Sequence, residues 1–283
     1  MLNNTIASLS SEGISQVALW DGITMGGGVG LTVHGKYRVA TEKTLFAKPE
    51  TGIGLFPDVG STHVLSRVKG GMPMGLYIGL TGARLKAADL IYSGLATHFV
   101  PSERLGALED SLARLPSADS VAVDRAILEA GGGAVADEST ATLAPRADAI
   151  HRCFSASTVE RIVAALTTEA GGSGAHAEWA AATLKTLLKQ SPTSVKITFE
   201  AIRRAQTMDI WKTLQMEYRM VQRCMRPQPQ SDFYEGVRAV LVDKDQSPVW
   251  SPSTLEQVSD EAVEGFFAPL GADHLLGELV ATR

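Results

Sequence analysis

The sequence predicts an α/β fold followed by a mostly helical region. Between residues 16 and 101, short apolar runs bounded by turn residues alternate with helix-like stretches, which is typical of strands alternating with helices. After Ser102, apolar residues recur every three or four positions in one segment after another, as in amphipathic helices. We therefore expect two parts, residues 1–101 and residues 102–283, and we find no tandem repeat in either.

The elements expected in the first part follow from its apolar runs and turn residues. A polar corner at residues 41–43 separates two short β-like runs, and Gly94 marks the end of a helical pattern. The expected strands are residues 17–20, 37–40, 44–47 and 98–100. The expected helices are residues 29–34, 59–68, 72–80 and 86–93.

The second part is expected to contain helices joined by flexible loops. Two glycine-rich stretches, residues 129–134 and 169–174, are predicted to be loops. The expected helices are residues 105–115, 159–166, 179–188, 210–225 and 231–243.

Composition narrows the class of protein. The 283 residues are 45% hydrophobic and 20% charged, which is ordinary for a globular protein. The net charge of −5 gives no broad basic surface for nucleic acid or an anionic membrane, and no apolar run reaches the roughly 18 residues of a membrane span. We therefore expect no nucleic-acid partner and no membrane partner.

Cysteine and histidine usage argues against a disulfide scaffold and a metal site. Cys153 and Cys224 are the only cysteines, and their distance in sequence favours a reducing compartment. The six histidines show no paired metal spacing. The first residues, 1–4, carry no signal-peptide pattern and no Arg-rich presequence. We expect no metal.

The most informative local feature is a glycine turn at residues 25–30, Met-Gly-Gly-Gly-Val-Gly. It follows an apolar strand and precedes a stretch that can open a helix. The free N–H groups of a helix start can hold a phosphate or stabilise a developing oxyanion. The alternative is a tight strand-to-helix corner that binds nothing.

Common nucleotide and hydrolase motifs are absent. Residues 30–37 nearly spell a phosphate-binding loop, but Tyr37 stands where Ser or Thr should hold magnesium. The chain contains no GxGxxG fingerprint and no Gly-x-Ser-x-Gly elbow. Nucleotide binding and serine-hydrolase chemistry are therefore disfavoured.

Two carboxylates follow in the acidic loop, residues 48–60. Glu50 has apolar neighbours, and a carboxylate in an apolar pocket has a raised pKa suited to general acid or base work. Its alternative is a solvated loop carboxylate. Asp58 precedes a predicted helix, so its alternative is an N-cap, which is compatible with facing a pocket.

These segments resemble the crotonase superfamily, and within it the family of 3-hydroxyisobutyryl-CoA hydrolases. The likeness spans residues 16–270 and is most specific in the last motif, Asp-Lys-Asp-Gln-Ser-Pro-Val-Trp. The matching segments are residues 21–30, 47–60, 80–85, 94–100, 191–198, 216–219, 233–241 and 243–250. The resemblance implies a crotonase-like spiral core with a mostly helical C-terminal region.

The resemblance also implies a reaction and the residues that carry it. The N–H of Gly27 would donate to the thioester carbonyl oxygen. Glu50 would act on the thioester as nucleophile or as base for water, and Asp58 would bind the substrate hydroxyl or direct proton transfer. The reaction would cleave 3-hydroxyisobutyryl-CoA into the free acid and CoA in valine breakdown, with no metal or redox cofactor. These three residues are thus both the catalytic and the substrate-binding candidates.

Related enzymes of the superfamily remain alternatives. Enoyl-CoA hydratases carry a second glutamate where this chain has Gly30, and a glycine where it has Asp58, so hydratase activity is disfavoured. Dienoyl-CoA isomerases pair a glutamate with a later aspartate and are the nearer rival. The C-terminal motifs favour the hydrolase.

The chain departs from the family pattern in three places. Residues 61–63 replace a more glycine-rich stretch, and inserted residues lie near Ser10. Residues 1–4 match the middle of the pattern, so the part that supplies the second oxyanion donor is expected to be missing. A lost donor typically costs on the order of 10²–10³ in rate. We therefore expect a protein starting at Met1 to be poorly folded or nearly inactive alone, which full thioester cleavage by this chain would contradict.

Several further expectations follow from the resemblance. The substrate partner would be an acyl-CoA ester, and a homo-oligomer is one option. The location would be mitochondrial. An inactive, truncated crotonase-like subunit that binds a partner is the non-enzymatic alternative.

Overall fold

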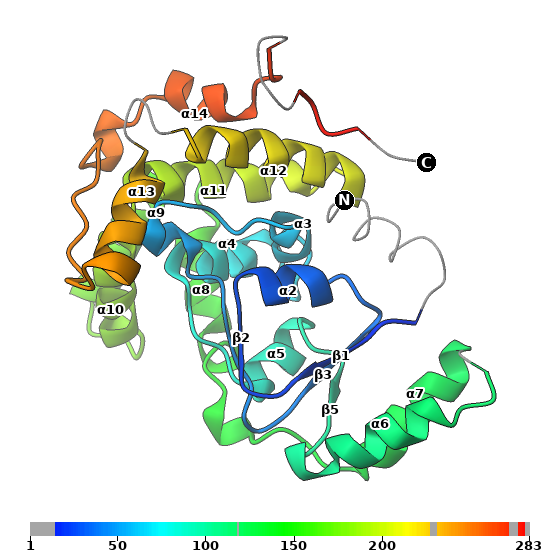
Figure 1. The fold of residues 1–283 in the computed structure, drawn as a ribbon. Helices are drawn as coiled ribbons and strands as arrows, with labels where there is room; N and C mark the ends of the chain where they lie inside the picture. Colours follow the sequence, from blue (N-terminus) through cyan, green and yellow to red (C-terminus); the bar gives the residue numbers. More distant parts are fainter. Residues whose placement is uncertain (1–14, 118, 227–230, 272–276, 281–283) are drawn as a thin grey trace. The chain divides into compact units, whose positions relative to one another are not determined.

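The computed structural model describes residues 15–117, 119–226, 231–271 and 277–280 (Figure 1). The chain splits into two compact units. The first lies within residues 1–47 and 84–146, and the second within residues 48–83 and 147–283. The parts expected from the sequence, 1–101 and 102–283, divide the chain at a single point, whereas each of these units is made of two separate segments. The expected division into domains stays a prediction. Residues 1–4 and Ser10 lie outside the described residues.

The first unit contains two small parallel sheets. β1 (Val17–Trp20), β3 (Tyr37–Ala40) and β5 (His98–Phe99) form a sheet in the order β1-β3-β5, with Val17 opposite Tyr37. β2 (Ile23–Met25) pairs with β4 (Leu45–Ala47). Parallel neighbours require a crossover between them, which here includes the glycine turn.

The helices of the first unit cover a small apolar core. Tyr37 and Val39 of β3 pack with Leu105, Leu108, Val123 and Ile127, and α6 and α7 lie side by side (Figure 1). The elements are α2 (Gly27–Thr32), α5 (Ala87–Ser93), α6 (Leu105–Ala113), α7 (Ser120–Gly131), and the 3₁₀ turns η2 (Ser102–Arg104), η3 (Glu138–Thr140) and η4 (Ala144–Arg146).

The second unit is helical. Its helices are α3 (Ser61–Leu65), α4 (Gly71–Thr81), α8 (Ala147–Phe154), α9 (Val159–Gly171), α10 (Ala177–Leu187), α11 (Pro192–Ala205), α12 (Ile210–Cys224), α13 (Asp232–Val237) and α14 (Asp260–Phe267). Shorter turns are η1 (Glu50–Ile53), the π-helical turn η5 (Arg238–Val242) and η6 (Leu255–Gln257).

The core of the second unit fixes the acidic loop. Leu55 and Phe56 are buried in one apolar cluster with side chains of α11, α12 and α14. These two loop residues lie between Glu50 and Asp58 in sequence, so the loop is anchored at its middle. The cluster contains Leu55, Phe56, Ile197, Ala201, Ala205, Met216, Met220, Cys224, Val258, Val263 and Phe267.

The α/β prediction is confirmed, and most expected elements are present with shifted ends. The helix expected over residues 59–68 is wrong in extent, because α3 covers only Ser61–Leu65. The loop expected over residues 129–134 is wrong at its start, because α7 continues to Gly131 and ends at a left-handed Gly132. The loop expected at 169–174 is wrong in the same way, since α9 runs to Gly171. The structure also contains elements that were not expected, namely β2, α7, α8, α11 and α14.

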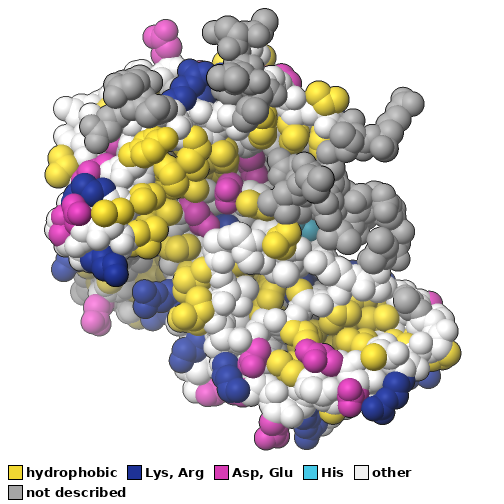
Figure 2. Space-filling model, in the orientation of Figure 1, with side chains coloured by type: hydrophobic (Ala, Val, Ile, Leu, Met, Phe, Trp, Pro, Cys, Tyr) yellow, Lys and Arg dark blue, Asp and Glu magenta, His cyan; other side chains and the backbone are white. Residues whose placement is uncertain are grey.

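The surface shows mixed charge. On the face drawn in Figure 2, Lys and Arg side chains are interspersed with Asp and Glu, so this face has no continuous basic area. Within the described part of the chain, no helix combines the length and the apolar character that crossing a membrane requires.

Candidate active site

The acidic loop is built on a short 3₁₀ turn with tight tertiary anchors. Glu50 opens η1, and the hydroxyl of the buried Thr51 donates to the Leu80 carbonyl at 3.3 Å. The turn ends at Gly54, whose φ of 71° is left-handed. A Cβ on Gly54 would lie 2.2 Å from the backbone carbon of Asp232, so only glycine allows α13 this close. These contacts fix the backbone that carries Glu50.

Glu50 is a buried carboxylate paired with a buried amine. Its residue is 5% exposed, Lys48 is 0% exposed, and Lys48 Nζ lies 2.8 Å from Glu50 Oε1. Within the described residues, neither Glu50 oxygen makes a hydrogen bond of regular geometry, and the close contact of the carboxylate is the Lys48 ion pair. Burial raises the pKa of Glu50, and the Lys48 charge opposes that rise. The alternative of a solvated loop carboxylate is wrong.

Asp58 ends the same loop in an unusual turn. Val59 has φ of 58° and Gly60 has φ of 77°. A left-handed β-branched residue is a rare, strained conformation. The N-cap of α3 is Gly60, which has no side chain, and Asp58 makes no capping hydrogen bond, so the N-cap alternative for Asp58 is wrong. Burial raises the pKa of Asp58, and Lys48 lowers it, so one ammonium acts electrostatically on both carboxylates.

A third carboxylate, Glu217 of α12, holds the end of the loop. Glu217 Oε2 accepts from the Gly60 N–H at 2.5 Å, and Oε1 accepts from the N–H and hydroxyl of Thr62 at 3.1 and 2.6 Å. Glu217 is 2% exposed. Burial raises its pKa to about 7, and the nearby Asp58 charge contributes to the rise. The site therefore has three carboxylates and one amine.

Lys48 and Glu217 are site residues that were not predicted, although the sequence contains a signal for each. Lys48 and Glu50 are two residues apart after a strand, the spacing that puts side chains on one face of an extended segment. Glu217 follows Leu214 by three residues and precedes Met220 by three, so it lies on the apolar face of its helix. Burying a charged side chain costs free energy unless the charge has a partner. A glutamate on the apolar face of a helix therefore indicates a buried polar contact.

Gly27 opens α2 in the first unit. It is exposed, and a Cβ there would meet nothing within 4 Å. The first helical N–H groups with backbone partners are those of Val29 and Gly30, which donate to the Gly26 carbonyl. A ligand therefore has room beside Gly27, and a hydrogen bond from its N–H to that ligand stays a prediction. Glu50 and Asp58 belong to the second unit, so the convergence of all three residues stays a prediction.

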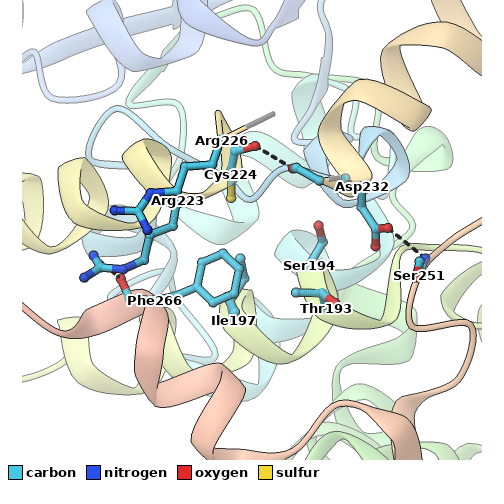
Figure 3. Close-up of a pocket in the computed structure, with 11 residues that line it drawn as sticks. Thr193, Ser194, Ile197, Arg223, Cys224, Arg226, Asp232, Ser251 and Phe266 are labelled. Carbon is cyan, nitrogen blue, oxygen red and sulfur yellow. Dashed lines mark hydrogen bonds between the residues drawn. The ribbon is translucent and has the colours of Figure 1, made fainter. Parts of the chain in front are cut away.

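A separate pocket of about 200 Å³ lies in the second unit (Figure 3). Its carboxylate, Asp232, accepts from the Ser191 hydroxyl at 2.6 Å and from the Ser251 N–H at 2.9 Å. Its Arg223 guanidinium donates to the carbonyls of Arg219, Phe266 and Pro269. These polar groups are occupied by structural contacts, and neither Glu50 nor Asp58 lines the pocket. We assign it no catalytic role.

Among residues 15–117, 119–226, 231–271 and 277–280, no group of three or more His, Cys, Asp or Glu is arranged to hold a metal ion. The expectation that the reaction uses no metal or redox cofactor stays a prediction. The two cysteines are buried and free.

Comparison with known proteins places the chain in a family. The model of the enoyl-CoA hydratase/isomerase family matches residues 1–267. The mitochondrial 3-hydroxyisobutyryl-CoA hydrolase of Rattus norvegicus is 46% identical over 279 residues, covering 97% of this chain and 68% of that protein. The 3-hydroxyisobutyryl-CoA hydrolase 1 of Arabidopsis thaliana is 46% identical over 271 residues, covering 94% and 68%.

Two solved structures share the fold. A carnitinyl-CoA dehydratase from Mycobacterium thermoresistibile matches with a TM-score of 0.82 and 33% identity, covering 99% of this chain and 74% of that one. An enoyl-CoA hydratase from Rhodobacter sphaeroides matches with a TM-score of 0.76 and 35% identity, covering 95% and 72%. The expected crotonase-like fold is confirmed, and this chain belongs to the enoyl-CoA hydratase/isomerase family of the crotonase superfamily.

Proposed function

We propose that this chain hydrolyses 3-hydroxyisobutyryl-CoA, a short hydroxyacyl-CoA thioester, to 3-hydroxyisobutyrate and CoA in valine breakdown. The names of relatives that are 46% identical support the substrate. The observation that carries the chemistry is the environment of Glu50. It is a buried carboxylate that accepts no hydrogen bond from the described residues and faces an ammonium 2.8 Å away. Such a group is available to a substrate.

Each residue has a role in the proposed reaction. The Gly27 N–H donates to the thioester carbonyl oxygen, where negative charge develops during attack. As the nucleophile, Glu50 attacks the thioester carbon, the C–S bond breaks with release of CoA, and water then cleaves the acyl-enzyme anhydride to 3-hydroxyisobutyrate and the free carboxylate. As the base, Glu50 takes a proton from the water that attacks the thioester, and CoA leaves as the acid forms. Lys48 opposes the rise in the pKa of Glu50 that burial causes, and so favours its ionised form. Asp58 binds the substrate hydroxyl or directs proton transfer.

Coenzyme A enters this reaction as part of the substrate, and the proposal requires no resident cofactor. The residues that contact its phosphates are not assigned. Lys48 is unsuited to that task, because it is fully buried and paired with Glu50. The location proposed for the chain is mitochondrial, since relatives carry that word in their names.

A lyase or isomerase of the same superfamily is the second candidate. The solved structures with the fold are named as a dehydratase and a hydratase. Against hydration, Gly30 stands where hydratases carry their second glutamate, and a glycine offers no side chain for acid–base work. Dienoyl-CoA isomerisation remains the nearer rival because it pairs a glutamate with an aspartate.

The test is to follow two products from the same protein sample. Free CoA from 3-hydroxyisobutyryl-CoA is titrated with a thiol reagent, and 2-enoyl- and dienoyl-CoA esters are followed by ultraviolet absorbance. We expect CoA release, reduced at least 100-fold in Asp58→Asn. An absorbance change without CoA release would replace the hydrolase with the second candidate. Neither signal from any ester would favour a non-catalytic subunit.

A further inference from the structure

We propose that Glu217 is a positioning residue for the reaction: through the turn 58–60 it holds Asp58 in its working place. The inference rests on the proposed function. It goes beyond that function because Glu217 lies on α12, 159 positions after Asp58, and is assigned no contact with substrate. The connection between them is the short stretch of backbone that follows Asp58.

The contacts of Glu217 replace a missing helix cap. The first N–H groups of a helix lack backbone partners, and a side chain at the N-cap usually accepts from them. Here the N-cap is Gly60, which has no side chain. Glu217 supplies the acceptor instead, with one oxygen on Gly60 and the other on Thr62. The Asp58 carbonyl accepts from the Ser61 N–H at 3.1 Å, so Asp58 is tied to the same turn.

The backbone of this turn needs external support. Val59 is β-branched and left-handed, a conformation that persists only where the surrounding structure imposes it. Val59 lies between Asp58 and Gly60, and Glu217 accepts a hydrogen bond from the Gly60 N–H. Release of Gly60 would let Val59 relax toward ordinary dihedrals, and that rotation would carry the Asp58 side chain with it.

A carboxylate is specifically required at this position. Three donors converge on Glu217, and both of its oxygens accept. A glutamine would place an NH₂ group against one of those donors. No ion pair with Glu217 is present within the described residues, and the negative Asp58 is close enough to raise its pKa. An expensive buried charge is thus retained beside the proposed site, where a neutral side chain would cost less to bury.

The experiment is a double-mutant cycle on the full 283-residue chain. Glu217→Gln, Asp58→Asn and the double variant are compared by kcat and KM for CoA release. We expect Glu217→Gln to lower kcat about 10- to 100-fold with KM changed less than about threefold, the size of a small misplacement. In the Asp58→Asn variant, adding Glu217→Gln should lower kcat by less than about threefold. An equal loss in both backgrounds, or no loss, would overturn the inference.

Two further variants keep the test decisive. Thr62→Val removes one of the three donors to Glu217 with little change in shape. If Glu217→Gln does not fold, Thr62→Val replaces it in the cycle, and it should lower kcat in the unmodified chain but much less in Asp58→Asn. Glu261→Gln, an exposed position on α14, is the matched control and should change nothing. Absence of CoA release by the unmodified chain would contradict the proposed function alone. Hydrogen exchange at the Gly60 and Thr62 amides then decides: faster exchange in Glu217→Gln supports the inference, and unchanged exchange overturns it.

Discussion

Glu50 and Asp232 are two buried carboxylates of the second unit that differ in their partners. Asp232 is 8% exposed, and two hydrogen bonds join it to Ser191, which caps α11, and to Ser251. Glu50 is 5% exposed, and its oxygens accept no hydrogen bond within the described residues. The difference indicates two tasks: Asp232 joins structural elements, whereas Glu50 keeps its oxygens available for a ligand.

The comparison also explains why Lys48 accompanies Glu50. A buried carboxylate without hydrogen bonds would become protonated, because burial penalises the charged form. The ammonium opposes that effect through its positive charge and its close contact with Oε1. A buried ion pair of this kind is weak evidence for stability and better evidence for chemistry.

The largest expected effect comes from removing the ion pair as a whole. The double variant Lys48→Met/Glu50→Gln should lose about 10³-fold in kcat, within the range for a general acid or base. Its thermal midpoint should stay the same or rise, because replacing both partners avoids burying an unpaired charge. CoA-release kinetics and calorimetry on one sample check both parts. A folded double variant with normal kcat would contradict the assignment of a chemical task to Glu50.

Asp58→Asn should have the next largest effect, about 100-fold in kcat/KM. Its thermal midpoint should remain within about 2 °C of the unmodified chain, because the Asp58 side chain caps no helix. Steady-state kinetics and a thermal melt are the measurements. A large loss of stability would show that Asp58 is structural, like Asp232.

Asp232→Ala tests the opposite side of the comparison. It leaves the Ser191 hydroxyl and the Ser251 N–H without their acceptor, so the free energy of unfolding should fall by about 2 kcal/mol. The kcat should stay within about threefold. Urea unfolding measures the first quantity, with the exposed Glu261→Ala as control. A selective loss of kcat at unchanged stability would contradict our assignment.

The smallest expected effect is a shift in pH dependence. Lys48 lowers the pKa of Glu50 and of Asp58, so Lys48→Met should raise both. Activity that needs the ionised forms is present above these pKa values and is lost as pH falls through them. The acidic limb of log(kcat/KM) against pH should therefore move to higher pH. Lys212→Met, on an exposed side chain, should leave the limb in place.

Much of the fold could be predicted from local pattern. The apolar runs of β1 and β3 were sufficient to predict these strands, and the apolar stretch of α4 was sufficient to predict that helix. α11 was missed because polar residues such as Lys196 and Thr198 interrupt its apolar stripe, although Ser191 and Pro192 form a recognisable helix start. α7 was missed as a helix, and its last residues were predicted to be a loop because they are rich in glycine, whereas the helix runs to Gly131 and ends at a left-handed Gly132.

The candidate site could be predicted only in part, for a physical reason. Glu50 and Asp58 are close in sequence and flanked by apolar residues, so local pattern indicated them. Their environment depends on tertiary contacts. Glu217 meets Gly60 across 157 positions, and no local rule links the two. The strain at Val59 likewise becomes visible only with the backbone dihedrals.

The most direct test of the central claim is Glu50→Gln, with binding and turnover of 3-hydroxyisobutyryl-CoA measured on the same folded sample. We expect that the ester still binds, within about tenfold in Kd, while CoA release falls at least 100-fold. Release at a rate within tenfold of the unmodified chain would contradict the claim that Glu50 acts on the thioester.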